Sequence, residues 1–404
     1  MNKKSILSAI LACAFTGAEA VGSNDDTLII NEIMSANVDQ FYSPSVNFDG
    51  WIELYNPTDQ VIPLGGLYFS DDSNNLKKWK APNLLGNIPA KGFKAVWFDN
   101  NELANTNVPF KLDLDGGTIY ISNASGTIIA SQTYPEAMER VAYARTTDGG
   151  DDWQLTADPT PGATNTTSAF ASDPLDAPQV SQPDQLFDSS ITVRVDIPTG
   201  CKLRYTSDGT LPTLTNGYTN STGIFNVRNT TCYRFRLFAE GRLPSPVVTR
   251  SYIKKDRDYT GHIVSIVADP DFLYSNEHGV MVRGTNGKPG RGQSSKCNWN
   301  MDWDRPVNFA YMLPGGVSAV NRDVDLEMCG GWSRAWEPHS FKLKGQKEYG
   351  GNKNLDYPFF AEKPYIRNRT LQVRNGGNDN NNRFKDPALE EIIFTSGIDI
   401  EGFY

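Results

Sequence analysis

The residues best suited to chemistry lie in the last third of the chain, and most of them are cations. Lys342 and Lys344 alternate with Phe341 and Leu343, and Arg374 ends a similar run that begins at residue 371. Alternation of apolar and polar residues is the pattern of a half-buried β-strand. Lysines in such a run line the wetter face of the sheet.

Glycine-rich corners adjoin these runs, at 330–331, 350–351 and 376–377. Glycine allows backbone N–H groups to face a ligand, and a Lys or Arg beside such a corner suits a phosphate. The sequence therefore predicts a phosphate or nucleotide site. The candidate set is made of the nearby cations and one acid: Arg334, Lys342, Lys344, Arg374 and Asp379.

Each candidate also has a structural explanation. Lysines on a wet strand face are usually solvated, and an aspartate in an Asn-rich loop, such as Asp379, is usually a turn residue. The basic, Gly-rich segment 283–296 lacks the G-x-x-x-x-G-K-[ST] pattern, so we expect a solvated hairpin loop there. No catalytic residue is assigned.

Several elements must position these residues. The pattern predicts strands over 262–268 and 280–282, and a hairpin of 307–312 with 317–328 around Pro314-Gly315-Gly316. A helix is expected over 387–395, capped by Asp386.

Four motifs occur in order along this part: Val-Ser-Ile-Val-Ala-Asp-Pro (264–270), Cys-Asn-Trp-Asn-Met-Asp-Trp-Asp-Arg-Pro-Val (297–307), Gly-Gly-Trp-Ser-Arg (330–334) and Arg-Asn-Gly-Gly-Asn-Asp (374–379). Together they resemble the spore-coat protein H (CotH) kinase family, in versions secreted by Bacteroidota. The resemblance covers residues 258–404. It implies an α+β kinase-like domain that uses ATP and Mg²⁺ to phosphorylate Ser or Thr hydroxyls of extracytoplasmic proteins.

The chain departs from that family in two ways. His339 stands where many members have a lysine before the Ser-Phe-Lys segment. The family's catalytic aspartates and metal ligands lie beyond the segment 397–404, so the resemblance covers the N-terminal part of the kinase domain. We therefore expect no phosphotransfer from this chain, and no metal site is assigned.

Residues 27–165 read as an all-β domain, with short β-rich runs separated by Gly, Pro, Asn and Asp: 28–30, 51–55, 93–98 and 118–121. The motifs Asn31-Glu32, 51–56, 64–67 and 160–162 resemble the lamin tail domain, which implies an immunoglobulin-like sandwich with a scaffold or adhesion role. Glu32 and Glu53 suggest an acid–base pair. Hydrogen bonding of turns at strand ends is the favoured interpretation.

A Thr-, Ser- and Pro-containing linker (166–177) leads to a second β-module over 178–253. Its motif 203–213, followed by Tyr218, resembles the C-terminal domain of chitobiase and β-hexosaminidase, which has a fibronectin-III-like (Fn3-like) sandwich. Asp208-Gly209 is a tight-turn dipeptide. We expect Tyr205 and Tyr218 to pack in the core rather than bind sugar.

The net charge of −9 over 404 residues argues against nucleic acid as a partner. Residues 1–20 have a Lys3-Lys4 start, an apolar core and an Ala-x-Ala end, which predicts an export signal. Lipidation of Cys13 and a buried N-terminal helix are the alternatives. No later apolar run reaches the roughly 18 residues of a membrane span. We expect a secreted or cell-surface protein whose partner is an extracytoplasmic protein or a surface glycan.

Four cysteines follow the leader, and an even number in an exported protein suggests disulfides. Proximity within domains favours Cys201–Cys232 and Cys297–Cys329, although four cysteines allow three pairings.

The predicted fold class is therefore multidomain and mainly β: an immunoglobulin-like sandwich, an Fn3-like sandwich and an incomplete α+β kinase-like domain. The rival to a kinase-related function is a structural or adhesive protein. A glycosidase is the least favoured, because no paired-carboxylate domain is evident.

Overall fold

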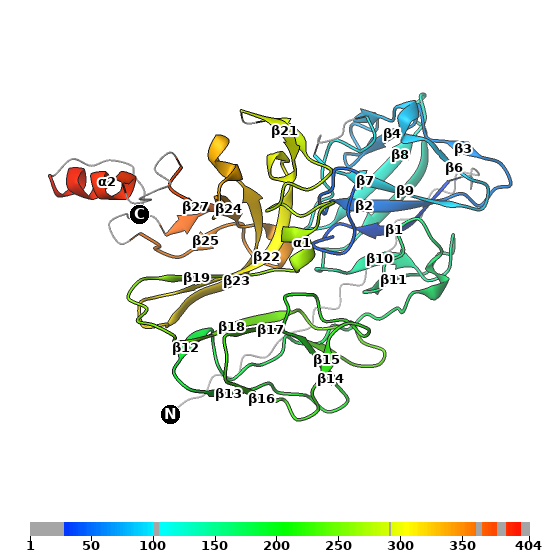
Figure 1. Cartoon of the computed structure of the whole chain (residues 1–404). Helices are drawn as coiled ribbons and strands as arrows, with labels where there is room; N and C mark the ends of the chain where they lie inside the picture. Colours follow the sequence, from blue (N-terminus) through cyan, green and yellow to red (C-terminus); the bar gives the residue numbers. More distant parts are fainter. Residues whose placement is uncertain (1–27, 101–104, 291, 361–365, 378–384, 397–404) are drawn as a thin grey trace, which may run out of the picture.

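The computed structural model describes residues 28–100, 105–290, 292–360, 366–377 and 385–396. The expected export signal, Cys13 and Asp379 lie outside these residues. The described chain is mainly β and forms three groups of sheets that follow one another along the sequence (Figure 1). The mainly-β, multidomain prediction is confirmed. None of the described helices has the length and apolar character needed to cross a lipid bilayer.

The first group is a sandwich of two antiparallel sheets around one core. One sheet has the order β11 (Trp153–Thr156), β10 (Ala142–Arg145), β1 (Ile29–Met34), β2 (Gly50–Tyr55), β7 (Phe93–Phe98). The other has the order β5 (Trp79–Lys80), β4 (Tyr68–Ser70), β8 (Gly117–Ser122), β9 (Ile128–Tyr134), beside the pair β3 (Ile62–Pro63) and β6 (Asn87–Ile88). Buried apolar residues of both sheets, such as Ile52 and Ile121, share the core. The four predicted β-rich runs of this region correspond to strands β1, β2, β7 and β8.

The second group is a smaller sandwich. Its main sheet has the order β12 (Gln185–Phe187), β18 (Val248–Lys254), β17 (Thr231–Phe238), β14 (Lys202–Thr206), β15 (Tyr218–Thr219). The pair β13 (Ile191–Arg194) and β16 (Ile224–Val227) covers its inner face, so that Val193, Phe225 and Phe235 share one core. Tyr205 packs against this core, whereas Tyr218 is 66% exposed, so core packing was correct for one tyrosine alone.

The third group is built on one antiparallel sheet of order β19 (Ile263–Val267), β22 (Asp304–Met312), β23 (Ser318–Met328), β24 (Phe341–Lys344), β27 (Thr370–Val373). Smaller pairs are β20 (Lys288–Gly290) with β21 (Gln293–Cys297), and β25 (Leu355–Asp356) with β26 (Arg367–Asn368). Helix α1 is Pro270–Tyr274, and α2 is Lys385–Thr395. The hairpin and the two alternating runs are confirmed, since Phe341 pairs with Val373 across β24 and β27.

One prediction for this third group was wrong. Residues 280–282 form a turn rather than a strand, because the Val280 N–H donates to the carbonyl of Phe272 at the end of α1. The solvated hairpin expected over 283–296 is confirmed, since β20 and β21 pair antiparallel there and most of their residues are exposed. Helix α1 was not predicted. Its signals are nevertheless present, with Asp269 as the N-cap, accepting from the Asp271 N–H, and Pro270 in the first turn.

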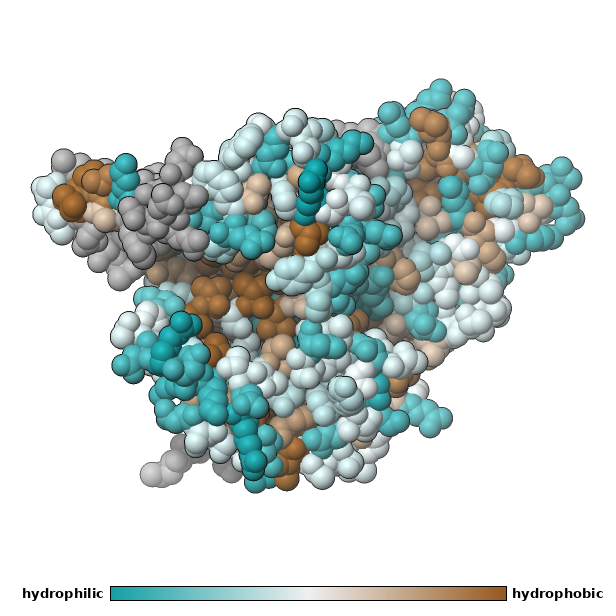
Figure 2. Space-filling model, in the orientation of Figure 1, coloured by the Kyte–Doolittle hydropathy of each residue, from teal (hydrophilic) through white to brown (hydrophobic). Residues whose placement is uncertain are grey.

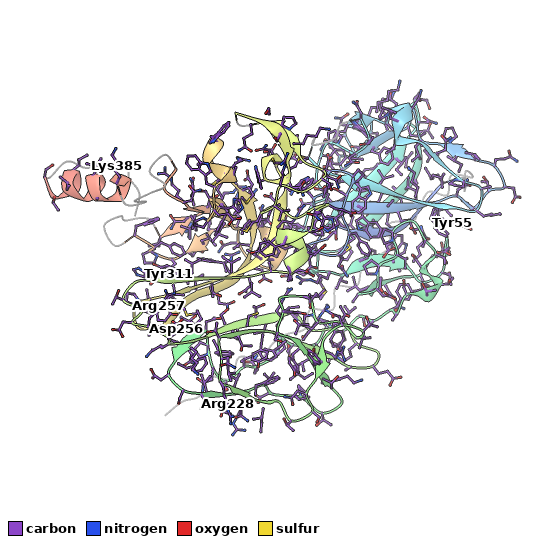
Figure 3. The ribbon with its side chains drawn as sticks, viewed as in Figure 1. Tyr55, Arg228, Asp256, Arg257, Tyr311 and Lys385 are labelled. Carbon is purple, nitrogen blue, oxygen red and sulfur yellow. The ribbon has the colours of Figure 1, made fainter. Side chains whose placement is uncertain are left out.

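Polar contacts join the three groups (Figure 3, where Tyr55, Arg228 and Tyr311 are labelled in the first, second and third groups). The Trp303 indole N–H donates to the Ser45 carbonyl at 2.9 Å, and the fully buried Arg305 donates to the Val46 carbonyl at 2.9 Å. Asn321 on β23 donates to Asp184, next to β12, at 2.7 Å. The third group therefore rests on both sandwiches.

Buried charges concentrate where the three groups meet. Arg140 makes a two-pronged contact with Asp39, both N–O distances being 2.7 Å, and the two side chains are 3% and 4% exposed. Burial alone would raise the pKa of Asp39, but the Arg140 guanidinium outweighs it and holds that pKa below its usual range. Arg234 and Arg236 of β17 and Asp323 of β23 lie within electrostatic reach of this pair. We call these five residues the charge junction.

Candidate functional site

The predicted phosphate cations occupy two different environments. Lys344 forms ion pairs within the protein, since its Nζ lies 2.5 Å from Asp304 Oδ1 and 3.3 Å from Glu327 Oε2. Burial would lower the pKa of Lys344, but these two carboxylates raise it, so the lysine is held as a cation. Lys342 lies 4.0 Å from the same Glu327 carboxylate and is more exposed. Lys344 therefore acts as a tie between β22, β23 and β24.

Arg334 also makes its contacts within the protein rather than facing a ligand. It lies on the short 3-10 helix Trp332–Ala335 and is 4% exposed. Its Nε donates to the Gly330 carbonyl at 2.8 Å, and its Nη1 donates to the Trp299 carbonyl at 2.7 Å. These bonds hold the 330–331 corner against the turn after β21. The Gly-rich corner is thus stabilised by the arginine that was predicted to serve a ligand beside it.

Three of the predicted cations do share one neighbourhood. Lys342, Arg334 and Arg374 all act electrostatically on the thiol of Cys329, which follows β23. The thiol is 4% exposed, and burial raises its pKa despite these charges. Of the three, Lys342 and Arg374 are the ones nearest solvent. The sequence therefore located a real cationic cluster, although Lys344 and Arg334 have internal partners.

The structure contains neither predicted disulfide. The four cysteines are free thiols: Cys201, Cys232, Cys297 and Cys329. For Cys201 and Cys232 the register explains this. Cys201 precedes β14 at the end where Lys202 pairs with Phe238, whereas Cys232 lies beyond the other end, where Thr206 pairs with Arg234. At about 3.3 Å per strand residue the two are roughly 20 Å apart, and a disulfide needs Cα atoms within about 7 Å.

The pair Glu32 and Glu53 has a structural role, as the favoured interpretation predicted. Both residues are fully buried. Glu53 Oε2 accepts from the N–H groups of Gly162 and Ala163 at 2.6 and 3.0 Å, and Glu32 Oε2 accepts from the Thr160 N–H at 3.1 Å. Burial raises the pKa of Glu32 to about 7 and that of Glu53 to about 8.

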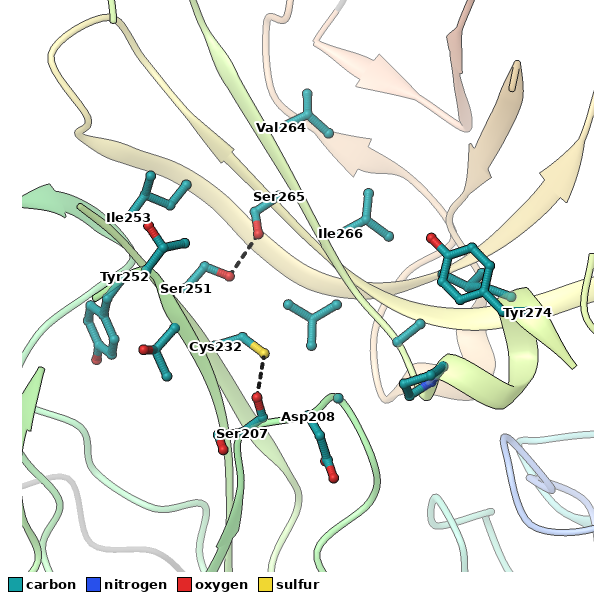
Figure 4. A pocket seen from close by; sticks show the side chains of 17 residues that line it. Ser207, Asp208, Cys232, Ser251, Tyr252, Ile253, Val264, Ser265, Ile266 and Tyr274 are labelled. Carbon is teal, nitrogen blue, oxygen red and sulfur yellow. Dashed lines mark hydrogen bonds between the residues drawn. The ribbon is translucent and has the colours of Figure 1, made fainter. Parts of the chain in front are cut away.

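A groove that the sequence did not reveal runs along β19, with a volume of about 700 Å³ (Figure 4). One wall is β19 with α1, including Val264, Ile266 and Tyr274, and the other is formed by β17 and β18. Val264 and Tyr274 are 44% and 60% exposed. Figure 2 shows apolar residues gathered in a hollow between the second and third groups, where β19 runs.

Polar groups close the floor and one end of this groove. The hydroxyls of Ser251 on β18 and Ser265 on β19 lie 2.8 Å apart and join the two groups (Figure 4). At the end of the groove Gly209 meets the backbone of Ala268 so closely that a Cβ at Gly209 would lie 2.0 Å from the Ala268 carbonyl oxygen. The groove is therefore a property of two groups together, since each supplies one wall.

The outer edge of β19 lies open along the groove. In its sheet β19 is the terminal strand and pairs with β22. Among the described residues no strand pairs with its other edge. An open edge presents unpaired backbone N–H and C=O groups to which a further strand can add. The described residues include no group of three or more His, Cys, Asp or Glu side chains placed to hold a metal ion.

Comparison with known proteins bears on the first group. No curated protein matches the chain. The family model described as Lamin Tail Domain matches residues 22–136, and the sheet of this group continues beyond the match through β10 and β11 to Thr156. The stretch 22–136 is thus a lamin tail domain of immunoglobulin-like, β-sandwich type, as its motifs predicted.

Proposed function

We propose that this chain is a non-catalytic, adhesive protein of the cell exterior that binds an extended segment of a partner protein in the groove along β19. The observation that carries the proposal is the open edge of β19 inside a groove whose β19 wall carries the apolar Val264 and Ile266. A partner strand would pair its backbone with β19, which supplies affinity, and place alternate side chains against Val264 and Ile266, which supplies specificity.

The arrangement of the groove supports this reading. Its walls come from two groups that are joined through Ser251 and Ser265, so it is largely formed before any partner arrives. A preformed site loses less conformational entropy on binding than a mobile one. An exterior location is proposed on the Lys3-Lys4 leader and on the resemblance of residues 258–404 to secreted CotH-type proteins.

A second candidate function is phosphate or nucleotide binding by the third group, as the CotH resemblance implies. The specific observation in its favour is that Lys342 and Arg374 gather near Cys329 beside the 376–377 corner. Against it, Lys344 and Arg334 already have internal partners. Under this candidate ATP and Mg²⁺ are the ligands. The adhesive function is preferred because a partner strand would bond to an edge of β19 with which no described strand pairs.

The binding test is selection of peptides from a random library on the full chain, followed by affinity measurement on two variants. We expect the selected peptides to lose at least about tenfold in affinity for Val264→Lys, because a charge would be buried in the groove. Val61→Lys is the matched control, since Val61 is 57% exposed on the first group. Peptides that bind both variants equally, or a failure to select any peptide, would refute the proposal.

The kinase candidate has its own assay. The chain is incubated with labelled ATP and Mg²⁺ beside a Lys342→Ala/Arg374→Ala variant, which removes the two cations nearest solvent. We expect no difference in incorporated label. Label that is incorporated by the parent chain and lost in the variant would establish phosphotransfer instead.

A further inference from the structure

The outward face of β17 carries Arg236, a buried arginine that forms no ion pair among the described residues. Along this strand Phe235 and Leu237 point into the sandwich core, so Arg236 and Phe238 point outward. Arg236 is nevertheless 7% exposed, because the first group covers this face. Its Nε donates to the Ser245 carbonyl at 3.0 Å, and its guanidinium lies 5.4 Å from the Phe238 ring centre.

The rest of the guanidinium has no protein partner. Among the described residues neither Nη1 nor Nη2 of Arg236 makes a hydrogen bond or an ion pair. The nearest acid of the charge junction, Asp39, is already held on both oxygens by Arg140. Burial, together with the like charge of Arg140, lowers the pKa of Arg236 to about 10. Asp39 and Glu139 act on the pKa of Arg236 in the opposite direction, but neither forms an ion pair with it among the described residues. An anionic ligand would therefore offset part of the cost of burying this cation.

A cavity of about 800 Å³ adjoins Arg236. It lies between the first and second groups, which Figure 1 shows side by side: Gln40 and Asp158 line it from the first, and Lys202 and Arg236 line it from the second. The Oε1 atom of Gln40, another lining residue, is buried and lacks a hydrogen-bond partner. The cavity is thus lined by the two Nη groups of a cation and by a neutral acceptor, Gln40 Oε1, none of which makes a hydrogen bond. A ligand that fits must supply an anionic acceptor and a donor together.

The remaining lining defines the ligand further. Phe170 and Leu214 offer apolar surface, and Leu214 at the rim is 66% exposed. Asp158 and Glu240 also lie at the rim, where they would repel a second negative charge and accept hydrogen bonds from hydroxyls. Lys202 adds a positive charge there. The ligand therefore carries one carboxylate, several hydroxyls and an apolar C–H face.

We propose that this cavity binds an acidic sugar of the hexuronic acid class. The sugar carboxylate accepts from Nη1 and Nη2 of Arg236, which is the fork-to-fork pairing that arginine makes with carboxylates. A ring hydroxyl donates to Gln40 Oε1, and the C–H face of the ring packs on Phe170. The site is independent of the β19 groove and gives the protein a glycan ligand as well as a protein partner.

A neighbouring cavity does not suit the same ligand. Arg236 also lines a second space of about 590 Å³, which is bordered by several acids: Asp115, Glu136, Glu139 and Glu348. The two other cations that line it, Arg140 and Lys347, already have carboxylate partners. These carboxylates would repel an anion. The acidic sugar is therefore assigned to the larger cavity alone.

The test is titration of the full chain with glucuronic acid, with glucose as the matched neutral sugar and N-acetyl-leucine as a model of a peptide carboxyl terminus. We expect glucuronic acid to bind in the millimolar range or tighter, and to bind at least about tenfold more tightly than glucose, since the two differ by the carboxylate. Failure of glucuronic acid to bind would overturn the proposal. Tighter binding of N-acetyl-leucine would also overturn it, and would assign the cavity to a peptide terminus.

Two variants locate the binding. Arg236→Gln should abolish the preference for glucuronic acid over glucose. Because Arg236 is buried and its variant could lose the fold, Leu214→Asp at the rim serves as an independent variant, and its added negative charge should weaken glucuronic acid binding about tenfold. Leu84→Asp is the control, because Leu84 is 72% exposed and does not line the cavity. Equal affinities for Leu214→Asp and Leu84→Asp would contradict the assignment.

Discussion

Glu32 on β1 and Glu53 on β2 are cross-strand partners, and both carboxylates turn inward to hold the segment that follows β11. Neither side chain reaches solvent. Two acids placed side by side in a buried site favour protonation, because an ionised carboxylate is poorly solvated there and repels its neighbour. Their pKa values, about 7 for Glu32 and about 8 for Glu53, follow from this placement.

This relationship predicts a loss of stability at alkaline pH. The folded protein holds protons on these acids that the unfolded chain releases near pH 4.5. The stabilisation is therefore present at low pH and is lost as pH rises through the folded pKa values. We expect the free energy of unfolding of the first group to fall by on the order of 6 kcal/mol between about pH 5 and about pH 9, because each unit by which a pKa is raised corresponds to about 1.4 kcal/mol.

Urea unfolding followed by tryptophan fluorescence measures this effect. Glu53→Gln keeps an acceptor for Gly162 and Ala163 but does not ionise, so its stability should vary less over the same range. A parent protein whose stability is constant or rises over that range would show that the carboxylates are ionised in the folded state.

The second prediction separates Lys344 from Lys342. Lys344→Met leaves Asp304 without its cation in a half-buried setting, so we expect a loss of about 2 kcal/mol. Lys342→Met removes a longer and more exposed contact, so its effect should stay within about 0.5 kcal/mol. Thermal unfolding compares the two. Equal losses would mean that Lys344 is not the tie between the strands.

The third prediction concerns the contact of Gly209 with Ala268. Gly209 has a φ of +89°, and any side chain there would strike the Ala268 carbonyl. Gly200 has a similar φ of +84° but open space around it. Gly200→Ala should therefore cost about 1–2 kcal/mol for backbone strain alone. Gly209→Ala should cost at least about 2 kcal/mol more, because it also forces the second and third groups apart.

Calorimetry reads out this difference. For Gly209→Ala we expect the second group to unfold at a lower temperature than the third, as a separate transition. If the two glycine variants melt alike, the close approach of the turn to Ala268 contributes nothing to stability.

The fourth prediction concerns the cysteines. Peptide mapping of the purified protein without reductant should find no peptide linking Cys201 to Cys232, because the register of β14 and β17 holds them at opposite ends. Labelling by a thiol reagent should proceed at Cys232, which is half-buried in the groove wall, before the buried Cys297. Recovery of the Cys201–Cys232 peptide would mean that the β14–β17 register is different in solution.

Local pattern predicted much of the fold. The alternation at Phe341 and Leu343 identified β24, and the glycines at 315–316 identified the turn between β22 and β23. The lamin tail motifs predicted the first sandwich. Failures came from contacts between distant residues. The turn at 280–282 depends on Phe272, and Cys201 was paired on proximity in sequence although the strand register separates it from Cys232.

The candidate sites were less predictable for the same reason. A run of lysines shows cations but not their partners, and the partner of Lys344 is Asp304, 40 residues earlier on another strand. The groove along β19 and the cavity at Arg236 each need walls from two groups, so no single stretch of sequence contains either. The sequence did contain one signal, since Arg234 and Arg236 alternate with core residues of β17. This alternation indicates that another part of the protein covers the outward face of the strand.

The charge junction limits how this molecule can be divided. Asp39 and Arg140 belong to the first group, Arg234 and Arg236 to the second, and Asp323 to the third. Removing any one group would expose to solvent charged side chains that are buried in the whole protein. The remaining groups would then carry charged side chains without their partners. Domain swaps and deletions should therefore keep the interacting charges together. A boundary placed in a linker would still separate charged residues that interact in the folded protein.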